Sequence, residues 1–398
     1  MAERRSVAAD VVGSKPTSRP NTSPASSSYP HGGLGQRVSG VLLLPASPTS
    51  SADSALPPWP SDYPPFHPRN WLRNGHMQTI AGNFLPRKSF LPKATQELVE
   101  VSHARAAQIS SQILCECHWQ PLPERPDRPT VLLLHGLEGS SRSQYVIGNA
   151  NKFWKAGFNV IRMNMRNCGG RKYEMARLTP TLYHSGLSGD VERVMRYFLE
   201  RESLRSISLL GYSMGGNLVL KLAGDLGSAA PAELKAVVGV SPVVDLAESA
   251  DALHESQNRL YERRFLKALL KRFRYKAMLF PRAFDPRIAD AVGSLREFDN
   301  RITALYSGFR DANDYYYRAA AARVLDKIAV PTLLIHACDD PFIRFTEDSR
   351  RKIEANPSVT LLETAHGGHC AFLAPPTPEN DGYWAEHTAL RFVRNHSQ

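Results

Sequence analysis

Hydrophobic residues along this chain gather in short runs that are separated by longer amphipathic stretches. Runs of strand length occupy residues 130–134, 160–165, 206–210, 236–240, 332–335 and 359–362. Apolar side chains recur at helical spacing over residues 140–155, over 189–199 and from Gly215 onward. Buried strands that alternate with helices are typical of a mostly parallel sheet with helices on both faces. The pattern therefore predicts an α/β fold.

Two stretches depart from this alternation. Residues 112–119 alternate less regularly, and we expect an antiparallel strand there, at the edge of the sheet. Residues 245–328 show no convincing strand pattern, so we predict a helical lid over about 246–328, between the sixth and seventh strands. Within it, Arg259 to Lys276 places leucines and a phenylalanine at helical spacing, with arginines and lysines between them. This spacing predicts a basic amphipathic helix.

The basic helix has two interpretations. It is either a packed surface helix with a solvated basic side or part of a lid that meets anionic lipid surfaces or head groups. The chain of 398 residues has a net charge of +11, which favours anionic partners in general without choosing among them. Because no recognised nucleic-acid motif accompanies the charge, we expect no nucleic-acid partner. The oligomeric state stays open.

Residues 1–58 are rich in serine, proline and alanine and lack apolar periodicity. We expect a disordered tail there, followed by one domain over residues 59–398. A transit peptide, or a gene start placed too early, would also fit the tail. No run has the length of a membrane-spanning helix. The five scattered cysteines show no zinc or redox spacing, which indicates reduced thiols and a cytoplasmic protein with, at most, peripheral membrane contact.

The sequence Gly-Tyr-Ser-Met-Gly at residues 211–215 lies between a predicted strand and a predicted helix. A serine between two glycines at such a junction is typical of a nucleophile elbow. The sharp turn forces positive φ on Ser213, and a Cβ at either flanking position would clash. A serine hydroxyl is a weak nucleophile at neutral pH, so it needs a histidine base and a carboxylate that orients the histidine.

The acid should follow a late strand, because the chain order in this arrangement is serine, acid, histidine. The strand at 332–335 leads into His-Ala-Cys-Asp-Asp-Pro-Phe at residues 336–342. If Ala337 is the small residue that ends the strand, the acid is Asp340. A shift of one residue would make it Asp339, so both stay candidates.

The base should lie in the loop after the last strand. There, residues 366–372 read His-Gly-Gly-His-Cys-Ala-Phe, and we predict His369 as the base, with His366 as the alternative. The two glycines allow this loop to fold tightly over the sheet edge. His135 and His184 lie outside that loop, and we expect them to be structural.

A tetrahedral oxyanion needs two fixed N–H donors. One should be the backbone N–H of Met214, directly after the nucleophile. The other should be the N–H of Leu137, in the loop after the first buried parallel strand, where Gly136 permits a close approach to substrate.

With these residues in place, the chain resembles the α/β-hydrolases, and specifically their YheT-like branch of bacterial esterases and eukaryotic abhydrolase-domain esterases and phospholipases. The resemblance covers residues from about 60 to 395 and excludes the N-terminal tail. Beyond the predicted triad it rests on residues 71–79, 166–170, 183–186, 241–242, 298–299 and 339–342. One departure is Asn167, which stands where we expect a glycine.

The resemblance implies hydrolysis of carboxylic esters through an acyl-serine, without a metal or an organic cofactor. It assigns the nucleophile, acid and base to Ser213, Asp340 and His369. The sequence therefore predicts an esterase for short- or medium-chain acyl esters, lipids among them. Acyl transfer at the same triad and a binding protein on a hydrolase scaffold are the alternatives.

Overall fold

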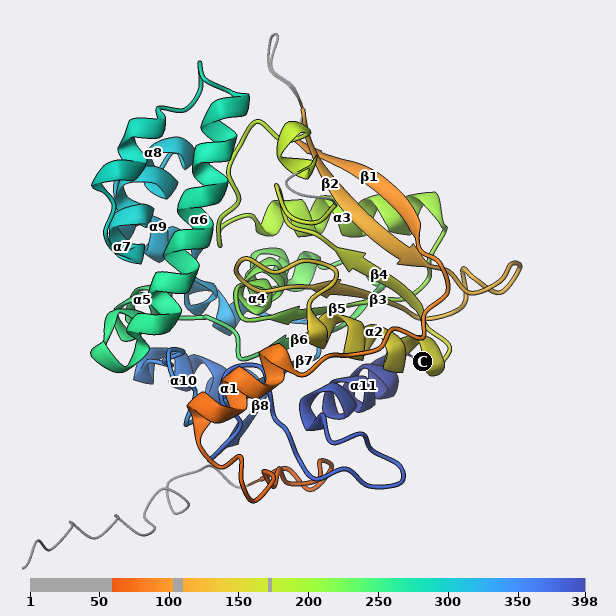
Figure 1. Cartoon of the computed structure of the whole chain (residues 1–398). Helices are drawn as coiled ribbons and strands as arrows, with labels where there is room; N and C mark the ends of the chain where they lie inside the picture. The colour runs from red at the N-terminus through yellow and green to blue at the C-terminus, as the bar shows by residue number, and fades with distance from the viewer. Residues whose placement is uncertain (1–58, 103–109, 171–173, 398) are drawn as a thin grey trace, which may run out of the picture. The chain divides into compact units, whose positions relative to one another are not determined.

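The computed structural model describes residues 59–102, 110–170 and 174–397. The tail predicted to be disordered, residues 1–58, lies outside the described residues. Within them, eight strands form one sheet in the order β1-β2-β4-β3-β5-β6-β7-β8 (Figure 1). The strands are β1 (Thr95–Ser102), β2 (Ser111–His118), β3 (Thr130–Leu134), β4 (Asn159–Met163), β5 (Ile207–Tyr212), β6 (Leu234–Val240), β7 (Thr332–Ala337) and β8 (Val359–Thr364).

The sheet is mostly parallel, as the strand pattern predicts. β3 to β8 pair in parallel, whereas β2 pairs antiparallel with both β1 and β4. The antiparallel strand predicted at 112–119 is thus present as β2, but its predicted edge position is wrong. The edge strand is β1, whose half-exposed Thr-Gln-Glu-Leu-Val-Glu-Val-Ser sequence buries only Val99 below a tenth exposure. An edge strand with so little buried surface leaves a weak hydrophobic pattern.

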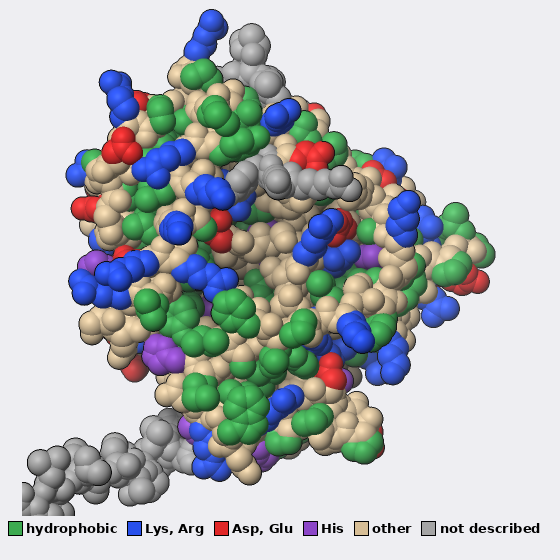
Figure 2. Space-filling model, viewed as in Figure 1, with side chains coloured by type: hydrophobic (Ala, Val, Ile, Leu, Met, Phe, Trp, Pro, Cys, Tyr) green, Lys and Arg blue, Asp and Glu red, His purple; other side chains and the backbone are tan. Residues whose placement is uncertain are grey.

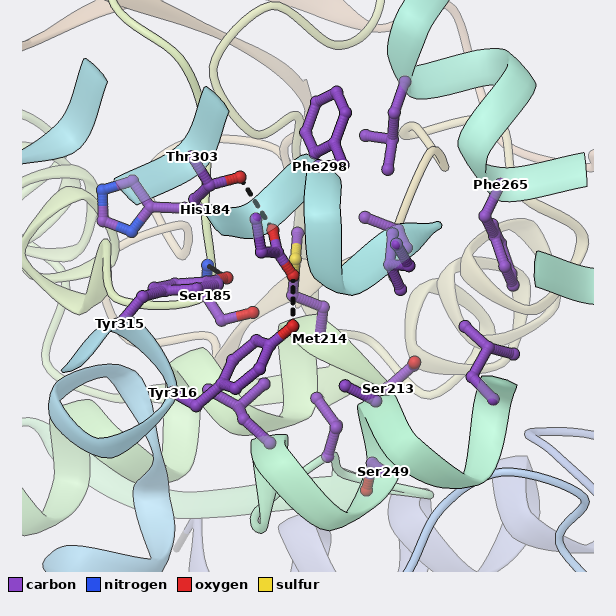
Figure 3. Close-up of a pocket in the computed structure, with 18 of the residues that line it drawn as sticks. His184, Ser185, Ser213, Met214, Ser249, Phe265, Phe298, Thr303, Tyr315 and Tyr316 are labelled. Carbon is purple, nitrogen blue, oxygen red and sulfur yellow. Dashed lines mark hydrogen bonds between the residues drawn. The ribbon is translucent and has the colours of Figure 1, made fainter. Parts of the chain in front are cut away.

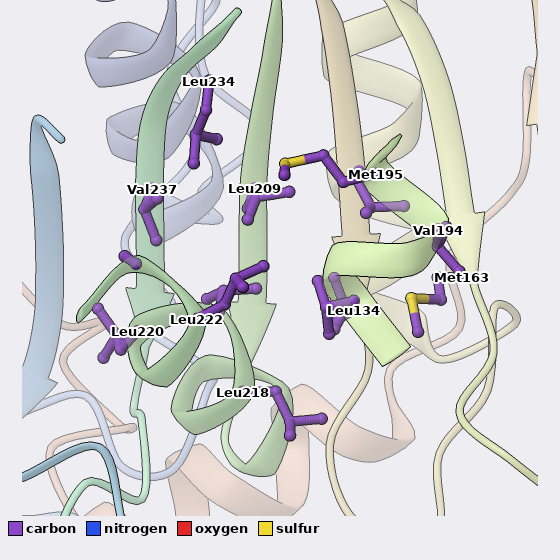
Figure 4. Packing of buried hydrophobic residues seen from close by; sticks show 14 of the residues in the cluster. Leu134, Met163, Val194, Met195, Leu209, Leu218, Leu220, Leu222, Leu234 and Val237 are labelled. Carbon is purple, nitrogen blue, oxygen red and sulfur yellow. The ribbon is translucent and has the colours of Figure 1, made fainter. Parts of the chain in front are cut away.

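Helices cover both faces of the sheet. Successive residues of a strand point to opposite faces, so each strand places apolar side chains under the helices of both faces. Leu132 and Leu134 face a core with α3 (Ser188–Arg201), α4 (Met214–Leu226) and α10 (Glu347–Ala355). Figure 4 shows that core, with Leu209 and Val237 of the sheet beside Leu218 and Leu222 of α4. The intervening strand positions, such as Val131 and Leu133, face α2 (Gln144–Lys155) and α11 (Trp384–His396).

The segment between β6 and β7 is helical, as predicted for the lid. It contains α5 (Leu246–His254), α6 (Arg259–Leu279), α7 (Leu295–Phe298), α8 (Ala304–Ser307) and α9 (Ala312–Ala319). These helices lie together beside the sheet (Figure 1). The predicted apolar positions of α6, including Leu266, Leu269 and Phe273, are buried in a cluster formed mostly by this segment and completed by residues that follow β7. In the described part of the chain, no helix combines the length and hydrophobicity needed to cross a bilayer.

Candidate active site

Ser213 occupies a strained turn between β5 and α4. Its backbone has φ 54° and ψ −118°, a conformation that costs a non-glycine residue on the order of 1–3 kcal/mol. A Cβ built on Gly211 would lie 2.1 Å from the carbonyl oxygen of Gly215, and one on Gly215 would lie 2.5 Å from that of His135. The two glycines are therefore required by close backbone contacts. The turn has the geometry expected of a nucleophile elbow.

Asp340 contacts the predicted base directly. Its buried carboxylate accepts a hydrogen bond from His369 Nδ1 at 2.8 Å through Oδ2. Through Oδ1 it accepts from the backbone N–H groups of Phe342 at 3.1 Å and Ile343 at 3.0 Å. Burial favours the neutral acid, but the charge of His369, the hydrogen bond from His369 and the other nearby donors together outweigh burial and leave the pKa of Asp340 below its usual value. The carboxylate is thus ionised and aimed at the imidazole.

Asp339, the alternative acid, has another partner. Its Oδ1 accepts from the backbone N–H of Gly368 at 2.8 Å, and its Oδ2 lies 3.4 Å from His366 Nδ1. These contacts fasten the loop that carries His369. Asp340 therefore pairs with His369, and Asp339 lies beside His366.

His369 lies at a cavity that Ser213 also lines. Burial by itself would lower the pKa of His369, whereas the Asp340 carboxylate raises it, and the net shift is upward. Because Nδ1 donates to Asp340, Nε2 is the nitrogen left for proton exchange at the cavity. Among the described residues no hydrogen bond joins Ser213 Oγ to His369, so the two side chains share a cavity without a hydrogen bond between them.

Helix α1 (Gly75–Phe84) explains part of the motif at residues 71–79. Thr79 Oγ1 accepts from the backbone N–H of His369 at 2.8 Å. Gln78 donates to the carbonyl of Leu72 at 2.9 Å and accepts from the N–H of Leu373 at 2.9 Å. A Cβ on Gly75 would lie 1.9 Å from the backbone oxygen of Asp339. The helix therefore holds the acid and histidine loops, although it lies far from both in the sequence.

The predicted oxyanion residues lie beside the serine. Leu137 and Met214 line an apolar cavity together with Ser213. A Cβ on Gly136 would come 3.0 Å from the Cβ of Ser213, so the two backbone segments approach closely. The N–H of Gly136 donates to the Tyr145 hydroxyl at 2.9 Å.

Glu138, the next residue of this loop, joins it to the lid. Its φ is 57°, an uncommon value for glutamate. Arg272 of α6 donates hydrogen bonds to both oxygens of its carboxylate, at 2.9 Å and 3.0 Å. The Tyr183 hydroxyl also donates to it, at 2.5 Å. These bonds offset the strained backbone of this loop, residues 136–139. Sequence reasoning missed this pair because 134 positions separate its members.

Asn167 stands at the position where we expected glycine. Its φ is 65°, a left-handed conformation that asparagine tolerates better than most residues. Its side chain donates to the carbonyl of Thr181 at 2.9 Å and accepts from Lys276 of α6 at 2.5 Å. The departure therefore preserves the turn and adds a second polar link to the lid.

Two cavities meet at Ser213, and Leu137, Phe265 and Phe342 also line both. The smaller, about 110 Å³, is mostly apolar and lies between the sheet and the lid (Figure 3). Asp299 is its one carboxylate among the described residues that line it, and it accepts hydrogen bonds from Thr303 at 2.7 Å and Tyr316 at 2.9 Å.

Burial raises the pKa of Asp299 to about 6. The larger cavity, about 450 Å³, lies between α1, the loop of residues 136–139 and α6. It contains more polar residues, including the candidate base His369.

His135 is buried in the loop after β3, and His184 lines the apolar cavity. His135 donates from Nδ1 to the carbonyl of Gly136 at 2.7 Å and accepts at Nε2 from the N–H of Met165 at 3.1 Å. Burial lowers the pKa of both His135 and His184 to about 4.

Comparison with known proteins identifies the family. A model of the alpha/beta hydrolase fold matches residues 129–376, more than half of the chain. This chain belongs to that family. The "Putative esterase YheT" of Escherichia coli is 30% identical over 77% of this chain and 87% of its own length.

Two further relatives of this chain are less similar. "Phospholipase ABHD3" of Bos taurus is 28% identical over 80% of this chain and 75% of its own. "Monoacylglycerol lipase" of Saccharomyces cerevisiae is 27% identical over 67% of this chain and 59% of its own. The names of all three relatives describe enzymes that cleave esters.

Proposed function

We propose that this protein is a serine hydrolase that cleaves carboxylic esters with short- or medium-chain acyl groups, lipids among them. The observation that carries the proposal is the 2.8 Å hydrogen bond from His369 to the buried Asp340 at a cavity shared with the elbow serine, Ser213. That arrangement supplies a nucleophile, a base and an orienting carboxylate. The sequence order of the three residues also fits this family.

In the proposed reaction, Ser213 Oγ attacks the ester carbonyl while His369 Nε2 accepts its proton. The backbone N–H groups of Leu137 and Met214 stabilise the oxyanion. The imidazolium, stabilised by Asp340, then protonates the leaving alcohol and an acyl-serine forms. Water activated by His369 releases the carboxylic acid and restores the serine. Each step uses only these groups, the ester and water.

The two cavities suggest how the ester lies. The apolar cavity suits the acyl chain, and the larger, more polar cavity suits the alcohol portion. Because α6 carries the basic residues predicted from the sequence, the proposal includes peripheral contact of residues 259–276 with anionic membrane surfaces. It also retains one catalytic domain over 59–398, with residues 246–328 as its lid. The cytoplasmic location stays a prediction.

A panel of acyl esters of graded chain length tests the proposed function. We expect purified protein to release free acid, with the highest kcat/KM for short or medium acyl chains because the apolar cavity is small. Each ester should be assayed with and without a dilute alcohol acceptor. Product ester that exceeds free acid would favour the acyltransferase alternative, and no turnover of any ester would favour the binding-protein alternative.

The link between Glu138 and Arg272 gives a separate prediction. Replacing Glu138 by glutamine should lower kcat by about 10-fold with little change in KM, because the N–H of Leu137 would be less well fixed in the transition state. Arg272→Met should have a similar effect, and the double variant should lose little more than either single variant.

The matched control is Arg274→Met. Arg274 lies on the same helix and forms an exposed ion pair with Asp290 at 2.9 Å. Steady-state kinetics should show its kcat unchanged. Fully additive losses in the double variant would contradict a shared role for Glu138 and Arg272.

A further inference from the structure

Helix α1 presents an apolar stripe to solvent. Met77, Ile80 and Phe84 are spaced three and four residues apart and are 47%, 50% and 64% exposed. Residues at this spacing lie on one side of a helix. The opposite side holds the histidine loop through Gln78 and Thr79. The stripe therefore lies on a helix whose opposite side is held by hydrogen bonds to the protein.

Helix α6 likewise has one buried side and one exposed side. Its inner side packs into the lid cluster, while Arg263, Arg264 and Lys267 on its outer side are exposed. Leu260, one turn earlier, is 79% exposed. The outward surface of α6 thus combines positive charge with an exposed apolar side chain.

The two helices lie next to each other. The ring of His76 stacks on that of Tyr261 at 5.8 Å, and the Arg264 guanidinium lies 5.1 Å from the centre of the Phe84 ring. Figure 2 shows arginine and lysine side chains over α6 on the same face of the molecule as hydrophobic side chains over α1. The apolar stripe and the basic surface therefore form one continuous patch.

This patch borders the larger of the two cavities. Ile80 and Phe84 line that cavity from α1 and Arg264 lines it from α6, with Ser213 and His369 at its inner wall. Among the described residues that line it, Glu138 is the one acidic side chain, and Arg272 neutralises it. The rim is consequently apolar and positively charged.

We propose that α1 and the outer side of α6 form a docking face for an anionic lipid membrane. Apolar side chains gain free energy by entering the interfacial layer, and arginine and lysine are attracted to anionic head groups. A bilayer satisfies both features at once. Docking would bring the cavity that contains Ser213 against the lipid, so a lipid ester could enter without crossing water. This inference deepens the proposed function and rests on it for the identity of the substrate.

Vesicle sedimentation tests the docking face. The full-length Ser213→Ala protein should be mixed with vesicles of phosphatidylcholine containing 30% phosphatidylglycerol, or of phosphatidylcholine alone. We expect binding to the anionic vesicles, weaker binding to the neutral ones, and a decrease as salt is raised. The pair Arg263→Gln and Lys267→Gln should weaken binding about 10-fold, and Met77→Ser about 5-fold.

Controls with matched exposure lie elsewhere on the sheet. Leu98→Ser changes a leucine that is 48% exposed on the edge strand β1. Arg205→Gln changes an exposed arginine that precedes the first residue of β5, whereas the elbow follows its last residue. Both should bind vesicles as the parent does. Absence of binding by the parent, or equal losses in controls and docking-face variants, would overturn the proposal.

Failure of docking and failure of the proposed chemistry give different results. Sedimentation measures binding in a protein that cannot form an acyl-serine, so it needs no activity. If wild-type protein hydrolyses soluble esters but its Ser213→Ala form does not bind anionic vesicles, the docking proposal is rejected and the proposed hydrolase function is retained. If vesicles bind through the docking face but no ester is cleaved, the surface is retained and the hydrolase is rejected.

Discussion

Replacing Ser213 by alanine is expected to lower kcat/KM for ester hydrolysis by about 10⁴- to 10⁶-fold. The hydroxyl oxygen is the atom that forms the covalent intermediate in the proposed mechanism. The small alanine should fit the turn, because Ser213 already has its Cβ in this strained position. The folded structure should therefore persist while activity is lost.

A fluorophosphonate probe provides the measurement. Wild-type protein should be labelled covalently, and the Ser213→Ala variant should not be labelled. Ser203→Ala is the matched control, since Ser203 is an exposed serine that also has positive φ, at 51°, but precedes β5 instead of following it. Labelling that survives in the Ser213 variant would place the nucleophile elsewhere in the chain.

Replacing Asp340 by asparagine is expected to lower kcat/KM about 10⁴-fold, because an amide can no longer hold the imidazole in its required tautomer or stabilise its positive charge. Asp339→Asn is the natural control. That residue contacts Gly368 and His366 instead of the base, so its replacement should loosen the loop and lower kcat/KM far less. Comparable losses in the two variants would contradict the division of roles between the two aspartates.

The dependence of kcat/KM on pH provides an independent measurement on the same variants. His369 must be neutral to accept the serine proton, so kcat/KM should rise with pH through the pKa of His369. Because the Asp340 carboxylate raises that pKa, the rising limb for the residual activity of Asp340→Asn should move to lower pH. In Asp339→Asn it should stay where it is in wild type. A limb that does not move in Asp340→Asn would show that His369 is not the titrating base.

The sequence by itself determined the alternation of strands and helices. The strands β3 to β7 are almost wholly buried and rich in apolar residues, since both their faces pack against helices. The elbow was also predictable, because Ser213 is flanked by glycines that the crowded backbone requires. The positions of candidate acids and bases after β7 and β8 followed from the same pattern, and the choice of Asp340 over Asp339 rested on strand register and on the family resemblance.

Only the tertiary structure decided which distant segments meet. It paired Asp340 with His369 and Asp339 with Gly368 and His366 of the same loop, a distinction that adjacent identical side chains do not encode. It also placed α1 behind the histidine loop and tied Glu138 to Arg272. Hydrophobic periodicity reports which face of an element is buried, but it does not report which element covers that face. Hydrogen bonds between residues far apart in the chain leave no periodic signal, so the support of this site becomes visible only in the folded molecule.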